Sequence, residues 1–154
     1  MTHGAEFIEA SRVFLTKDLL PRLIDCVEKM SEEDIWWRPN EQSNSVGNLV
    51  LHLCGSVRQW VVATIGGARV HRNRDAEFST RERLPKAELI ERLRSAMSEV
   101  DDVLAGLPEN RLLVRYMVKA FNPSALQAVY HTVEHFSYHL GQILYIYKLR
   151  TGAQ

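Results

Sequence analysis

The chain has 154 residues, with 19 Lys and Arg against 19 Asp and Glu, so its formal net charge is zero. This balance excludes the strongly basic surface expected of a protein that wraps nucleic acid or lies on an anionic membrane. Because 45% of the residues are hydrophobic and 25% are charged, the composition is that of an ordinary globular protein, and we expect a single domain over residues 1–154.

The start of the chain and the cysteines indicate a protein of the cytoplasm. Residues 1–7 lack the basic segment and the long apolar stretch of a secretory signal. No stretch approaches about 18 uninterrupted apolar residues, which predicts that no helix spans a membrane. Cys26 and Cys54 lack the CxxC spacing of a thiolate zinc site, so we expect two reduced thiols that fill the core.

The first predicted element is one long helix. Apolar residues recur at helical spacing from about Glu6 to Met30. Pro21 lies inside this helix and is expected to bend or divide it, because a proline removes one hydrogen bond and clashes with the previous turn. Residues 31–45 are rich in turn-forming residues but contain Trp36 and Trp37, which predicts a loop with a hydrophobic anchor.

A second helix is predicted from Val46 to about Ile65, with Ser45 as its N-cap and two glycines after its end. Residues 68–84 then form a long connection, and connections of this length are often functional. Its five arginines suit an anionic substrate at the mouth of a site, but three acidic residues, Asp75, Glu77 and Glu82, can neutralise them. We favour a solvated surface loop and leave it outside the predicted site.

Two further helices complete the predicted fold. Pro85 suits the first turn of a third helix over 86–107. After an ambiguous segment, Asn122 and Pro123 supply the N-cap and first turn of a fourth helix, which reaches about residue 149 and ends before Gly152. Because period-two alternation is nearly absent, we predict an all-α fold, and four long amphipathic helices most simply form a four-helix bundle.

Three of the six histidines, His131, His135 and His139, recur at a spacing of four on the fourth predicted helix. They lie within about 40° of His135 on the helical wheel, and Gln142 falls in the same stripe. Neighbours at this spacing can bind one ion, but His131 and His139 are about 12 Å apart along the helix. One adjacent pair, together with His52 from the second helix, is therefore a reasonable metal site. The spacing does not decide whether that pair is His131 and His135 or His135 and His139.

Two other interpretations of these histidines compete with a metal site of this kind. Residues 131–135 match H-x-x-E-H, the inverted zinc-protease motif, although a five-residue match is weak evidence. Glu134 lies about 100° from His135 on the helix, which places it outside the stripe. In the second interpretation the histidines bind no metal and are polar residues of the core. The protein would then act by associating with a partner, and its tryptophans are suited to such an interface.

Two ordered blocks of the sequence resemble the DinB/YfiT-like superfamily of small metal-binding four-helix bundles. The blocks are Trp37-Arg-Pro-Asn with Ser43-Asn-Ser-Val-Gly-Asn-Leu-Val-Leu-His52-Leu, and His135-Phe-Ser-Tyr-His139-Leu-Gly-Gln142. The segment Arg74-Asp-Ala-Glu-Phe78 is similar to one uncharacterised subgroup. The resemblance spans nearly the whole chain, and the two blocks in order are more specific than either one alone.

The resemblance implies a divalent ion, most often zinc or nickel, bound by His52, His135 and His139. His131 and Gln142 then become accessory residues beside the site. Three histidines leave coordination positions open for water or substrate. The resemblance also makes a homodimer an expectation.

The resemblance does not assign one reaction. Related proteins include bacillithiol- and mycothiol-dependent transferases, a thiol-dependent maleylpyruvate isomerase and proteins described as metal-dependent hydrolases. We therefore expect a metal-dependent hydrolase, or a transferase that also uses a low-molecular-weight thiol, acting on a small-molecule substrate. The alternative is a non-enzymatic metal-binding module for stress response or interaction, in which the ion stabilises the bundle.

Overall fold

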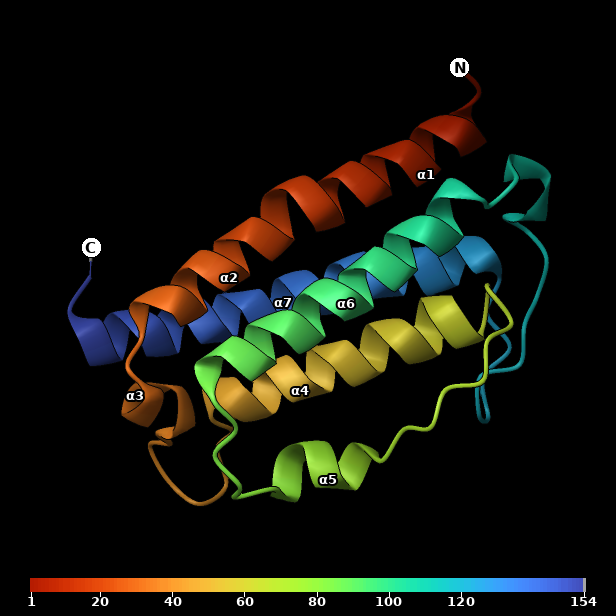
Figure 1. Ribbon diagram of the computed structural model, residues 1–154. Coiled ribbons are helices and arrows are strands. Elements are labelled where there is room, and N and C mark those ends of the chain that lie inside the picture. Colours follow the sequence, from red (N-terminus) through yellow and green to blue (C-terminus); the bar gives the residue numbers. More distant parts are fainter. Residues whose placement is uncertain (154) are drawn as a thin grey trace.

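Four long helical rods lie side by side and enclose the core of the protein (Figure 1). The computed structural model describes residues 1–153. The rods are α1 (His3–Val13), continued by a π-helical turn and α2 (Leu20–Lys29); α4 (Val46–Val57), continued by π-helical Arg58–Ala63; α6 (Lys86–Ala105); and α7 (Ala125–Thr151). The predicted all-α four-helix bundle is confirmed.

The first rod passes through Pro21 without a break. The turn Phe14–Leu19 is π-helical, and the Leu20 N–H donates to the Leu15 carbonyl, five residues earlier. A widened turn of this kind accommodates the proline, which has no N–H to donate and whose ring crowds the preceding turn. Of the two expected effects of Pro21, a bend or a division, the helix is not divided, and α2 continues the direction of α1 (Figure 1).

The predicted loop over 31–45 contains a short helix, α3 (Glu32–Trp36), capped by Ser31. The predicted hydrophobic anchor is present, since Trp36 is buried and its Nε1 donates to the Leu84 carbonyl at 3.2 Å. Its ring lies so close to α4 that a Cβ at Gly47 would stand 2.7 Å from it. The first turn of α4 therefore needs a residue without a side chain at this position.

The predicted solvated loop over 68–84 is corrected by the structure. It contains α5 (Arg74–Ser79), which begins at the capping residue Asn73 and lies outside the four rods, against α4 (Figure 1). The buried Asn48 side chain donates to the Glu77 carbonyl at 2.9 Å and to the Thr80 carbonyl at 3.3 Å. These bonds fix the segment to α4, although most of its residues remain exposed.

The last rod begins two residues later than predicted. Ser124, and not Asn122, is the N-cap of α7, because its side chain and that of Gln127 each bond the other residue's backbone N–H. Pro123 precedes the helix, and its carbonyl accepts from Tyr116. Gly152 ends α7 with a φ of 69°, as predicted from its lack of a side chain.

The described residues, 1–153, form no strand, as predicted. The ambiguous segment after α6 holds a short 3-10 helix, Glu109–Arg111, and two isolated bridges. Cys26 and Cys54 are free and buried, as predicted. No helix in the described part of the chain has the length and apolar character needed to cross a membrane.

Candidate metal centre

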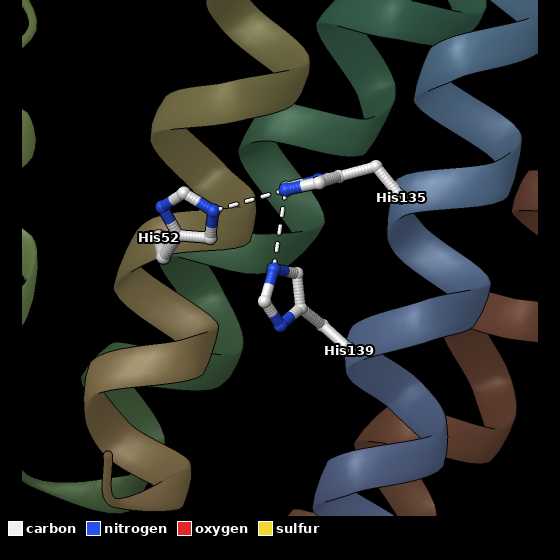
Figure 2. A group of neighbouring side chains, drawn as sticks. All are labelled: His52, His135 and His139. Carbon is white, nitrogen blue, oxygen red and sulfur yellow. Dashed lines mark hydrogen bonds between the residues drawn. The ribbon is translucent and has the colours of Figure 1, made fainter. Parts of the chain in front are cut away.

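Three histidines from α4 and α7 turn their rings toward one another (Figure 2). The Nε2 atom of His135 lies 3.0 Å from Nε2 of His52 and 3.1 Å from Nε2 of His139. One nitrogen from each ring lies within 4.8 Å of the other two. His52 and His139 are buried, and His135 is partly exposed. The structure thus groups the two histidines one turn apart on α7 with the histidine from the facing helix.

The hydrogen bonds on the far side of two rings show which nitrogens carry protons. His139 Nδ1 lies 2.7 Å from Gln142 Oε1, and His52 Nδ1 lies 2.9 Å from Glu77 Oε2. Amide and carboxylate oxygens accept hydrogen bonds, so both Nδ1 atoms donate and both Nε2 atoms keep a lone pair. His135 Nε2 carries at most one proton, which leaves lone pairs facing one another in one of the two close contacts.

A cation at the meeting point of these nitrogens resolves the contact between lone pairs. Nitrogen ligands about 2.0–2.1 Å from one divalent ion stand roughly 2.9–3.4 Å apart, depending on the geometry of coordination. The two measured separations, 3.0 and 3.1 Å, fall in this range. The group His52, His135 and His139 can therefore hold a metal ion.

Burial favours the neutral form of His135 and His139. Burial is the largest cause that lowers the pKa of His135 to about 3, and the neighbouring rings of His139 and His52 contribute to this shift in the same direction. Burial also lowers the pKa of His139, although the hydrogen bond to Gln142 opposes this shift. Because metal ligation needs an unprotonated nitrogen, these two residues are ready to bind an ion at neutral pH.

The metal-free protein is expected to lose stability as the pH falls below about 6.5, the pKa of a free histidine. The folded chain keeps His135 unprotonated down to about pH 3. Between these values the unfolded chain binds a proton that the folded chain does not bind, so acid favours unfolding. Urea unfolding with chelator over this range measures the slope of the unfolding free energy against pH. The slope is expected to be shallower in His135→Gln, and equal slopes would contradict this assignment.

Arg72 and Glu77 form an ion pair directly behind His52. Arg72 Nε donates to Glu77 Oε1 at 2.8 Å and Arg72 Nη2 donates to Glu77 Oε2 at 2.9 Å, and both side chains are only 10% exposed. Burial alone would raise the pKa of Glu77, but the hydrogen bonds from Arg72 and His52 outweigh it and lower this pKa. We expect 68–84 to lie outside the site, but the structure places Glu77 of this segment in contact with His52. Glu77 also neutralises an arginine, as expected.

The two residues predicted to be accessory, His131 and Gln142, lie beside the three histidines. Gln142 contacts His139, as described above. The centre of the His131 ring is 5.2 Å from that of His135 and 4.4 Å from that of Trp60. Glu134 is exposed and lies 3.6 Å from His131 Nδ1, so it points away from the group, as the helical wheel indicated.

Two aromatic side chains that sequence reasoning did not single out individually also contact the histidines. The Phe78 ring lies 4.5 Å from the His52 ring, and the exposed Tyr138 ring lies 5.0 Å from the His139 ring. Both residues belong to segments that carried the family resemblance, and this resemblance was the only sign in the sequence that they lie near the site. Their spacing alone did not distinguish them from ordinary packing residues.

The fold is that of a DinB-like helical bundle. The structure is similar to the crystal structure at 2.01 Å of a DinB-like protein from Bacillus cereus ATCC 10987, with a TM-score of 0.69 and 9% sequence identity. The match covers 90% of this chain and 89% of that one. This chain belongs to a family described as proteins of unknown function, DUF1572, whose model matches residues 3–154. No curated protein matches.

Proposed function

We propose that the protein binds one divalent metal ion, zinc or nickel, through His52, His135 and His139. The observation that carries this proposal is the convergence of three histidines from two helices, in which His135 Nε2 lies 3.0 Å from His52 Nε2 and 3.1 Å from His139 Nε2, distances that suit a common ion. His131 and Gln142 have accessory roles. Imidazole ligands suit both metals, so availability in the cell decides which of them is bound.

We further propose that the site catalyses hydrolysis or thiol transfer on a small-molecule substrate. Three protein ligands leave coordination positions open, and a bound divalent ion lowers the pKa of a water or thiol there enough to supply a nucleophile near neutral pH. Glu77 has both oxygens in hydrogen bonds to Arg72 and His52, so it is not placed to act as a general base on a substrate.

Two clefts large enough for a small molecule border Gln142 and His131, the residues predicted to be accessory. A cleft of about 370 Å³ borders Gln142 and is lined by the aromatic rings of Trp37 and Tyr145. A second cleft of about 380 Å³ borders His131 and Trp60. Volumes of this size are common for small-molecule sites, and the aromatic walls favour a substrate with an apolar part.

Turnover measurements test the catalytic part of the proposal. The protein is prepared metal-free, loaded with zinc, nickel or manganese, and assayed against ester, amide and electrophilic substrates with and without bacillithiol and mycothiol. Metal-dependent turnover that His135→Ala lacks supports the proposal. An inactive protein across this panel, with metal bound, counts against catalysis while leaving the metal site in place.

The second candidate is a non-enzymatic metal-binding module, favoured by the placement of the three histidines on two different rods of the bundle. An ion that binds only the folded chain stabilises it by mass action. If chelation lowers the melting temperature and no substrate or thiol perturbs the bound metal, this candidate is preferred. The homodimer expected from the resemblance stays a prediction, which light scattering can test.

A further inference from the structure

We propose that Glu77 and Arg72 are positioning residues of the metal centre: Glu77 fixes the tautomer and orientation of His52, and Arg72 fixes Glu77. The inference rests on the proposed metal-binding function. Its basis is the buried chain of contacts that runs from Arg72 through Glu77 Oε2 to His52 Nδ1, at distances of 2.9 Å for both steps. A metal-ligating histidine commonly donates its second N–H to a carboxylate in this manner.

The tautomer of His52 follows from the chemistry of its neighbours. Nδ1 lies 2.9 Å from Glu77 Oε2 and 3.2 Å from Arg72 Nη2. The Arg72 Nε and Nη2 groups already donate to the two Glu77 oxygens, and an ionised carboxylate can only accept. The proton therefore lies on His52 Nδ1 and points at Glu77. Nε2 is left with its lone pair directed at the other two histidines.

The ion pair is itself rigidly held. Arg72 and Glu77 share two parallel hydrogen bonds, and the remaining Arg72 Nη1 donates to Gln59 Oε1 at 2.6 Å. Asn48 holds the Glu77 backbone against α4, and the Phe78 ring packs on the His52 ring. His52 is thus fixed along one edge by a carboxylate and across one face by an aromatic ring.

The helix that carries His52 leaves space for this ion pair at Gly55. A Cβ at Gly55 would overlap Glu77 Oε1 and stand 2.9 Å from Arg72 Nε. Glycine is unfavourable inside a helix relative to alanine, so its presence in α4 needs a local reason. The close approach of Glu77 and Arg72 supplies that reason, because any side chain at this position would push the carboxylate away from its present place.

The two helices position their ligands by different means. His139 is oriented by the neutral amide of Gln142, which comes from the same helix and is exposed. His52 is oriented by a buried carboxylate from a segment 25 residues further along the chain. A charge-assisted hydrogen bond is stronger than a neutral one and makes the ligand nitrogen more basic. We expect the larger contribution to metal affinity from Glu77.

Zinc affinity of the Glu77→Gln variant tests this role. The full chain is prepared metal-free and titrated with zinc against a competing chelator. The amide has one acceptor oxygen for three N–H groups, two from Arg72 and one from His52, so we expect zinc to bind roughly 10–100-fold more weakly than in the wild type. The matched control is Glu82→Gln, which makes the same charge change at an exposed position of the same segment and is expected to bind zinc as the wild type does. Gly55→Ala displaces the carboxylate without removing its charge and is expected to weaken binding in the same direction.

A second measurement on metal-free protein separates positioning from general damage to the fold. Imidazole 1H–15N correlation spectra are expected to show the wild-type His52 with its proton on Nδ1, and Glu77→Gln with an increased share of the Nε2–H tautomer. Circular dichroism verifies that both proteins are folded. An unchanged tautomer, or zinc affinity equal to that of Glu82→Gln, overturns the proposal. If the wild type binds no zinc, the proposed function fails, and the tautomer spectra alone decide the role of Glu77.

Discussion

His135→Ala protein purified without chelator is expected to contain no stoichiometric metal, whereas the wild type is expected to contain about one equivalent per chain. His135 is the middle member of the group, because its Nε2 is the atom that lies 3.0 Å from His52 and 3.1 Å from His139. Removing it leaves two ligands on different helices. Elemental analysis of the purified protein measures the metal content.

His131→Ala is the matched control for this variant. It removes the same type of side chain from the same helix, one turn earlier. The His131 ring packs at a tilt against Trp60, beside the group of three. We expect this protein to keep its full metal content. A full equivalent of metal in His135→Ala, or an equal loss in both variants, would refute the assignment of the ligands and with it both proposed functions.

Helix ends were predictable where a side chain completes the backbone hydrogen bonds locally. Ser45 caps α4 and Gly152 ends α7 because the required side chain, or its absence, lies within a few residues of the helix end. The start of α7 was misplaced at Asn122 because Asn122 and Ser124, two residues apart, are both suitable caps. The reciprocal bonds of Ser124 with Gln127 decide in favour of the later one.

The histidines were predictable as a group but not as a set of ligands. The spacing of four brings both possible pairs on α7 into register, and the wheel places His52 only at the margin of its helix. The family resemblance, and not the geometry, distinguished His139 from His131. In the structure the difference lies in packing, since the His131 ring rests against Trp60 and its Nδ1 faces Glu134.

The ion pair behind His52 was not predictable from the residues of its own segment. Five arginines and three acidic residues over 68–84 are equally compatible with a solvated loop. What separates Glu77 from its neighbours is tertiary: Asn48 binds its backbone, and Gly55 leaves room for its carboxylate. The relevant signals therefore lay in the preceding helix, where an unexplained glycine and a buried asparagine mark the surface on which the segment docks.

Phe136→Ala is expected to lower the free energy of unfolding of the metal-free protein by about 3–5 kcal/mol. Phe136 has no exposed surface and is among the largest fully buried side chains of the core. The substitution reduces the apolar surface that folding buries. It also leaves a cavity that the surrounding rods can only partly fill. Urea unfolding with chelator present measures the change.

Tyr145→Ala provides the comparison on the same helix, because Tyr145 is 67% exposed and its truncation is expected to change the free energy by less than about 0.5 kcal/mol. A loss of less than about 1 kcal/mol in Phe136→Ala would contradict the packing of α7 described above, since burial of a whole aromatic side chain contributes more than this.

Adding zinc to Phe136→Ala and Tyr145→Ala tests whether the packing of Phe136 also affects metal binding. A ligand at about 100 times its Kd raises the free energy of unfolding by about 2.7 kcal/mol. Phe136 neighbours His135 in sequence, but the buried Val129, Leu140 and Ile143 also hold α7 in the bundle. We therefore expect zinc to add nearly the same increment to Phe136→Ala as to Tyr145→Ala. A much smaller increment in Phe136→Ala would mean that this one ring also orders the ligands, because independent sites contribute additively.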